Sequence, residues 1–214
     1  ALVPILQEQG VEAIVVLLHE GGSQEPPPGN IDACVGISGP VVAINDALDA
    51  EIDAVITGHT HLPYNCLLDD PAGDPRIVTS AYSYGRVVTE LNLVIDPRDG
   101  ELNRDASSSV NHAVIQADLT PDPVMSAIIA KWQPLVDAAG DTPIGEISAD
   151  INRGGTPPGT DRGVESAAGN LVADAQQWAT SANGSQIAFM NPGGVRSDLT
   201  YAASGTEGDG VVTF

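Results

Sequence analysis

Basic residues are scarce in this chain. Its 214 residues include 8 lysines and arginines against 29 aspartates and glutamates, so the formal net charge is −21. Such a charge repels the phosphates of nucleic acids, which argues against binding of a nucleic-acid duplex. A site for any phosphate-bearing ligand would therefore depend on local metal ions or on a few well-placed arginines.

Long apolar runs are absent and cysteines are few. Although 42% of the residues are hydrophobic, no run reaches the roughly 18 residues that a membrane-spanning helix needs. The sequence therefore predicts a globular protein with no membrane span within this chain. Cys34 and Cys66 are the only cysteines, and neither has zinc-finger spacing to a histidine. We expect one disulfide and a secreted or cell-surface protein, although two small buried thiols would look the same.

Apolar patterning predicts an α/β fold. Residues 1–10 and 41–48 have helical spacing, whereas residues 12–18 and 54–57 are apolar runs typical of parallel strands covered on both faces. Further strands are predicted over residues 76–81 and 86–95. In the second half, Thr120 is the predicted N-cap of a helix near residues 121–139, and a helix over residues 165–180 precedes a short strand over residues 187–190.

Both buried strands run into turns that carry histidine. His19 follows the first strand, and His59 and His61 follow the second within the sequence GHTH. The carboxyl ends of strands in an α/β sheet are where ligands bind, and Gly58 would allow close backbone approach. Imidazoles two residues apart suit Zn, Mn, Fe or Ni. Taken alone, His19 would fit a polar cap on loop carbonyls better than a metal ligand, and His112 is expected at the surface.

Five segments, in this order and spacing, resemble the calcineurin-like metallophosphoesterases and in particular their 5'-nucleotidase branch. They are VVLLHEGG at 15–22, DAVITGHTHLPYNC at 53–66, SAYSYGRVV at 80–88, ESAAGNLVADA at 165–175 and FMNPGGVRSDL at 189–199. The resemblance implies the C-terminal half of a metallophosphoesterase β-sandwich flanked by helices in residues 1–118. A connecting helix in residues 119–140 and part of an α/β 5'-nucleotidase substrate domain in residues 141–214 would follow.

The resemblance also implies a pair of divalent metal ions, such as Zn or Mn. His19 and His59 match ligands of one ion and His61 a ligand of the other, and a metal-bound hydroxide, not a side chain, is the nucleophile. The family's other ligands come from an Asp-x-His turn, a bridging Asp and a GNH[DE] turn, none of which occurs here. We therefore expect an N-terminal portion before this chain. Three neutral imidazoles do not offset two divalent charges, so the chain alone should hold at most one metal, weakly.

Substrate-binding residues are implied in the second half. Asn191, Gly194 and Arg196 match positions that face the substrate in the family, Arg162 matches another anion-binding arginine, and Arg153 is a weaker candidate. Without the family, NPGGVR would equally fit a glycine-rich turn with an exposed arginine. The two phenylalanines with which the family clamps the base have no counterpart, so base preference is not predicted.

The implied activity is metal-dependent hydrolysis of phosphoric monoesters, with nucleoside 5'-phosphates or related diesters and nucleotide sugars as substrates. The chain by itself is expected to be inactive, because part of its metal site is missing. The alternative is a non-catalytic ectodomain that binds a nucleotide or a metal. The upstream Asp, His and Asn ligands would distinguish the two.

Overall fold

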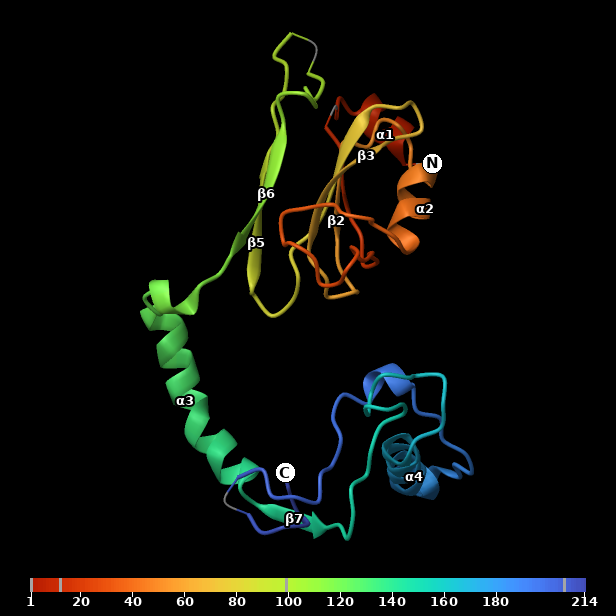
Figure 1. The fold of residues 1–214 in the computed structure, drawn as a ribbon, viewed down its shortest axis with the longest axis vertical. Coiled ribbons are helices and arrows are strands. Elements are labelled where there is room, and N and C mark those ends of the chain that lie inside the picture. Colours follow the sequence, from red (N-terminus) through yellow and green to blue (C-terminus); the bar gives the residue numbers. More distant parts are fainter. Residues whose placement is uncertain (1, 12, 99, 206) are drawn as a thin grey trace. The chain divides into compact units, whose positions relative to one another are not determined.

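A computed structural model describes residues 2–11, 13–98, 100–205 and 207–214 (Figure 1). The chain forms two compact units, Ala1–Thr120 and Pro121–Phe214. Both contain helices and strands, so the predicted mixed α/β class is confirmed.

The first unit is built on a four-stranded sheet beside a two-stranded hairpin. The strand order in the sheet is β1-β2-β4-β3, where β1, β2 and β4 are parallel and β3 is antiparallel to β4. The carboxyl ends of the three parallel strands therefore share one edge. The elements are α1 (Val3–Glu8), β1 (Val15–Leu17), α2 (Pro40–Ala47), β2 (Ala54–Thr57), β3 (Tyr64–Asp69), β4 (Pro75–Ser80), β5 (Val87–Asn92), β6 (Ser108–Ala113) and the 3₁₀ helix η1 (Gln116–Asp118).

Most of the predicted strands are present, with different lengths or burial. β2 coincides with the predicted strand over residues 54–57 and is largely buried. The prediction that residues 12–18 form a strand covered on both faces was wrong. Only Val15–Leu17 is a strand, Leu17 is 78% exposed, and residue 12 lies outside the described residues. β1 lies at the end of the strand order, so only one of its sides is paired within the described sheet.

An apolar core joins the two helices to the sheet. Val3 of α1 and Val41 of α2 are buried with Val55 of β2 and Val78 of β4, so both helices contribute to the same core. Burying side chains of this size stabilises a fold by about 1.5–3 kcal/mol each. The core therefore fixes β2 and β4, which lead into the turns described below.

One buried amide attaches the β5–β6 hairpin to the sheet. The Nδ2 group of Asn111 on β6 donates hydrogen bonds to the carbonyl oxygens of Ile31, Tyr64 and Ser80, at 2.7, 3.1 and 3.1 Å. Its Oδ1 accepts a hydrogen bond from Thr89 of β5. The hairpin is thereby held against the ends of β3 and β4. Sequence patterning did not predict β3 or β6, because polar residues interrupt both.

A buried ionic cluster stabilises the opposite, amino-terminal edge of β2 and β4. Arg104 contacts Asp70 at 2.6 Å and Asp53 at 3.4 Å, and Arg76 is fully buried with Asp70 at 3.9 Å. Burial raises the pKa of Asp70, but the hydrogen bond from Arg104 and two backbone N–H donors outweigh it and hold that pKa at about 2. Asp70 is therefore charged at neutral pH.

The second unit has little buried apolar surface in the part that the structure describes, where Ala168 is its one buried hydrophobic residue. The predicted helix is capped by Asp122, whose carboxylate accepts the N–H groups of Val124 and Met125 at 2.9 Å, so the predicted Thr120 cap was wrong. Residues 187–190 form no strand. The elements are α3 (Pro123–Gly140), β7 (Pro143–Glu146), α4 (Ala167–Thr180), η2 (Ser181–Asn183), η3 (Pro192–Gly194) and β8 (Val211–Thr213), with β7 and β8 antiparallel.

Candidate functional site

His19 and His59 lie next to each other at the carboxyl-terminal edge of the first sheet. β1 and β2 are adjacent and parallel, with Leu17 opposite Ile56, and each continues into one of these histidines. The two ring centroids are 5.1 Å apart and the ring planes meet at 66°. The two imidazoles, which come from different strands, therefore lie side by side, whereas convergence of His61 with them stays a prediction.

Backbone contacts fix the two histidine turns against each other. The N–H of Gly58 donates to the carbonyl of Glu20 at 3.2 Å, and the hydroxyl of Thr60 donates to the carbonyl of Gly22 at 3.0 Å. A Cβ on Gly21 would lie 2.5 Å from the carbonyl oxygen of Gly58, whereas a Cβ on Gly58 would meet nothing closer than 3.9 Å. The glycine that permits the close approach is therefore Gly21 and not, as predicted, Gly58.

The GHTH turn has an unusual backbone. His59 has a φ of 65° and His61 a φ of 56°, both in the left-handed region. Such conformations are uncommon for residues other than glycine and cluster at functional sites, where the surrounding structure maintains them. Because His59 and His61 are both left-handed, the GHTH turn does not continue the extended backbone of β2.

His61 contacts an aromatic residue that the sequence did not single out. The centroids of its ring and the Tyr84 ring are 5.6 Å apart, in an edge-to-face arrangement. Tyr84 belongs to the loop that follows β4, where Tyr82 and Tyr84 also have positive φ, of 68° and 59°. SAYSYGRVV carries part of the family resemblance, but no pattern in it indicates contact with a histidine.

The donors at this edge are suited to Zn or Mn but do not complete a dinuclear centre. Among the residues that the structure describes, no group of three or more His, Cys, Asp or Glu side chains is arranged to hold a metal ion. Two divalent ions close together repel each other unless anionic ligands offset their charge. His19, His59 and His61 can therefore supply only part of the ligands of such a centre.

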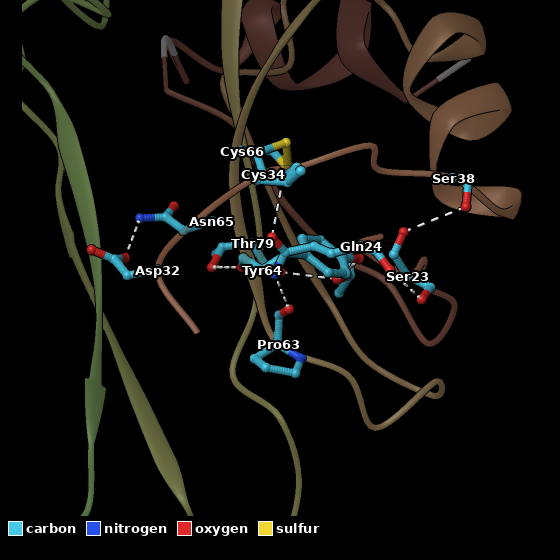
Figure 2. The surroundings of a disulfide bond; sticks show 12 residues. Ser23, Gln24, Asp32, Cys34, Ser38, Pro63, Tyr64, Asn65, Cys66 and Thr79 are labelled. Carbon is cyan, nitrogen blue, oxygen red and sulfur yellow. Dashed lines mark hydrogen bonds between the residues drawn. A yellow bond between two sulfur atoms is a disulfide. The ribbon is translucent and has the colours of Figure 1, made fainter. Parts of the chain in front are cut away.

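A disulfide joins the loop that follows His19 to strand β3. Cys34 and Cys66 are bonded with their Cα atoms 4.9 Å apart, which confirms the predicted pair (Figure 2). Near it, the side-chain amide of the buried Gln24 donates to the carbonyls of Asn30 and Pro63, both at 2.8 Å. The loop of residues 23–39 is thus attached to the start of β3, directly after the GHTH turn.

A buried hydroxyl pair connects this scaffold to β2. The phenol of Tyr64 and the hydroxyl of Thr57 share a hydrogen bond, and Thr57 donates to the carbonyl of Thr79 at 2.9 Å. Burial raises the pKa of the Tyr64 phenol, and the hydrogen bond with Thr57 only partly opposes that rise. The phenol is therefore neutral at physiological pH and acts as a structural donor.

The substrate residues predicted in the second unit gather around the η3 turn. The Oδ1 of Asn191 accepts the N–H of Gly193 at 3.1 Å, and the guanidinium of Arg196 donates to the carbonyl of Gly193 at 3.1 Å. An ideal Cβ on Gly193 would lie 3.3 Å from Nη1 of Arg162, which places that guanidinium over the turn from a separate loop. Gly194 closes the turn with a hydrogen bond from its N–H to the carbonyl of Asn191.

Arg153, the weaker substrate candidate, has a structural role. Its guanidinium contacts the Asp198 carboxylate through two hydrogen bonds of 3.1 Å, and its backbone N–H donates to the same carboxylate at 2.7 Å. These hydrogen bonds hold the pKa of Asp198 below its usual value and raise the pKa of Arg153. By contrast, no ion pair among the described residues includes Arg162 or Arg196.

Comparisons with known proteins agree with the resemblance. Residues 143–213 match the family profile of the 5'-nucleotidase C-terminal domain. Three curated relatives each align with 91% of this chain: Endonuclease YhcR of Bacillus subtilis at 27% identity, cell wall protein Lmo0130 of Listeria monocytogenes at 28%, and a probable 5'-nucleotidase of Treponema pallidum at 24%. The chain spans 14%, 25% and 39% of their lengths.

A solved structure resembles the chain over nearly its whole length. The 5'-nucleotidase precursor from Thermus thermophilus is 26% identical, with a TM-score of 0.55 over 99% of this chain and 38% of that chain. The profile match identifies a 5'-nucleotidase C-terminal domain in residues 143–213, and the Treponema relative and the Thermus structure show that the chain as a whole is similar to 5'-nucleotidases.

Proposed function

We propose that this chain works within a metal-dependent phosphoric monoester hydrolase that acts on nucleoside 5'-phosphates or related nucleotides. The observation that carries the proposal is the pair of imidazoles, His19 and His59, at the ends of adjacent parallel strands. The same chain contains a 5'-nucleotidase C-terminal domain in residues 143–213.

In this proposal the first unit contributes metal ligands. His19 and His59 would bind one divalent ion, and His61 would bind its neighbour, with Zn or Mn as the ions that suit imidazole. Bound ions of this kind polarise a phosphoryl oxygen and make water acidic enough to act as a nucleophile. The contribution of this chain is to orient the imidazoles, which the contacts of Gly21 and Thr60 with the facing turn achieve.

The second unit would bind the rest of the nucleotide. Asn191, Gly194 and Arg196 lie on the η3 turn, and Arg162 reaches it from another loop. Because the net charge of −21 repels anions at long range, local guanidinium groups without carboxylate partners are suited to hold anionic substrate oxygens.

The second candidate function is a non-catalytic module that binds a nucleotide or a single metal. It is favoured by the η3 turn, where Arg162 and Arg196 lie close to Gly193 and take part in no ion pair among the described residues. Binding of one metal with no phosphate release, even in a longer protein that contains this chain, would support this candidate.

We propose an extracytoplasmic location, secreted or at the cell surface. The Cys34–Cys66 disulfide and the relatives named as a cell wall protein and a nucleotidase precursor are consistent with it. Among the described residues, no helix is long and apolar enough to cross a membrane. One relative is named an endonuclease, but this chain spans 14% of it, and its own acidity argues against duplex binding.

Phosphate release from AMP with added Mn or Zn tests the proposal. We expect the chain of 214 residues alone to release little phosphate, whereas a longer natural protein that contains it should be active. In the longer protein, His59→Ala should lower kcat/KM by about 100-fold or more, because a metal ligand is lost. His112→Ala is the matched control, because that exposed histidine pairs with Glu90 on the hairpin. Equal activity of His59→Ala and His112→Ala would refute the proposed role of the histidine turns.

A further inference from the structure

A third loop reaches the edge that carries the histidine turns. β4 is parallel to β2, with Ser80 opposite Thr57, so the loop after β4 emerges at the same edge as the GHTH turn. The loop contains Tyr82, Tyr84 and Arg86 and continues into β5. The carboxyl ends of adjacent parallel strands are the usual position of ligand sites in α/β proteins.

The side chains of this loop form a continuous series of contacts with the histidine turn. The Tyr84 ring lies edge-to-face on His61, with the centroids 5.6 Å apart. The guanidinium carbon of Arg86 is 5.3 Å from the centroid of Tyr82 and 5.5 Å from that of Tyr84. Tyr84 therefore lies between the histidine and the arginine and contacts both.

Arg86 has no acidic partner among the residues that the structure describes, in a chain that is strongly acidic. Acidic residues outnumber basic ones by 29 to 8, and Arg76, Arg98, Arg104 and Arg153 each pair with an aspartate. None of the ion pairs between described residues includes Arg86, which is exposed. Its charge is thus available to an anion from solution.

The aromatic contacts decide which ligand chemistry fits. A guanidinium over an aromatic ring keeps its N–H groups directed outward in its own plane, where they can donate two parallel hydrogen bonds to one phosphate. The guanidinium of Arg86 lies over both tyrosine rings, so the feature that these three side chains offer together is a supported cation. An oxyanion is therefore favoured over a base.

We propose that Arg86, supported by Tyr82 and Tyr84, binds a second phosphate group of the substrate, next to the phosphate at the histidine turns. The site would favour nucleotides with two linked phosphates over nucleoside monophosphates. This assignment rests on the proposed function, because it takes the histidine turns as the position of the reacting phosphate.

Binding to the metal-free chain tests the anion site independently of catalysis. Inorganic pyrophosphate is titrated while the NMR signals of the Tyr84 ring, the His61 ring and the Arg86 Nε–H group are followed. We expect saturable shifts of all three signals, and affinity for inorganic phosphate lower by about tenfold, since each additional charged hydrogen bond contributes about that factor. Equal affinity for phosphate and pyrophosphate would indicate a site for free phosphate and overturn the second-phosphate assignment.

Variants separate binding from packing. Arg86→Gln should remove the NMR shifts caused by pyrophosphate. Arg86→Lys keeps the positive charge but loses the planar guanidinium that donates two parallel hydrogen bonds, so it should weaken pyrophosphate binding by about tenfold. Arg98→Gln, which removes an exposed arginine paired with Asp96, should leave binding unchanged. Unchanged pyrophosphate affinity in Arg86→Lys and Arg86→Gln, or no shifts with the unaltered chain, would refute the proposal.

Kinetics in a longer active protein give a second measure. Arg86→Gln should raise KM for ADP by about tenfold with kcat within about twofold, and should change KM for AMP by less than about threefold. An equal effect on both substrates would refute the second-phosphate role. If Arg86→Gln abolishes pyrophosphate binding while the unaltered longer protein hydrolyses no AMP, the anion site is supported and the proposed function is refuted.

Discussion

The close approach of the two histidine turns gives the sharpest prediction. In Gly21→Ala the new Cβ would lie 2.5 Å from the Gly58 carbonyl oxygen and 2.8 Å from the Thr60 hydroxyl. The turns would have to separate by roughly 1 Å to restore an ordinary contact. Overpacking of this kind costs about 1–3 kcal/mol of the free energy of unfolding. Because the turns carry His19 and His59, the same shift should weaken Zn binding by about tenfold.

Gly58→Ala is the matched control, since its Cβ would meet nothing closer than the His19 ring nitrogen at 3.9 Å. Urea unfolding gives the change in stability, and titration with Zn, followed by the NMR signals of the His19 and His59 rings, gives the affinity. We expect Gly58→Ala to stay within about 1 kcal/mol of the unaltered chain. The reasoning is refuted if Gly21→Ala is as stable as Gly58→Ala and binds Zn equally well.

Two further predictions concern the scaffold of the first unit. Replacing Cys34 and Cys66 with serine should lower the free energy of unfolding by about 3–4 kcal/mol, because the bond closes a loop of 32 residues in sequence separation; unchanged urea unfolding after replacement would contradict this. Asp70 has a lowered pKa of about 2 against 3.8 unperturbed, so its contribution of roughly 2 kcal/mol is complete above about pH 5 and is lost as the pH falls toward 2. Unfolding measured from pH 6 to 2 should show that loss in the unaltered chain and a smaller one in Asp70→Asn; identical slopes would refute it.

The strands β2, β4 and β5, the longer helices and the histidine turns could be predicted because their signals are local, whereas β3 and β6 could not. The apolar run over residues 54–57 forms the largely buried β2, and the position of His59 two residues after it fixes the sheet edge where that residue lies. The helix start was harder, because Thr120-Pro121 and Asp122-Pro123 present the same cap pattern two residues apart. Only the hydrogen bonds of the Asp122 carboxylate distinguish them.

The remaining features depend on contacts between distant segments. Tyr84 meets His61 because β4 pairs with β2, and Arg153 binds Asp198 across 45 residues of sequence. The two histidine turns face each other so that Gly21 lies against the Gly58 carbonyl, and a side chain would therefore clash at Gly21. That alignment of the two turns depends on how β1 and β2 pair. Periodicity and composition contain none of this information.

The Asn111 amide has a consequence for chemical ageing. Its Nδ2 group serves carbonyl oxygens from three separate segments, at Ile31, Tyr64 and Ser80. Deamidation to aspartate changes a single heavy atom and leaves the size of the side chain the same, yet it would turn a donor into an anionic acceptor facing three acceptors. Spontaneous conversion at this one position would therefore weaken the attachment of the β5–β6 hairpin at Asn111 and leave the contacts of Ser109 with Asn65, even though no atom of the apolar core had changed.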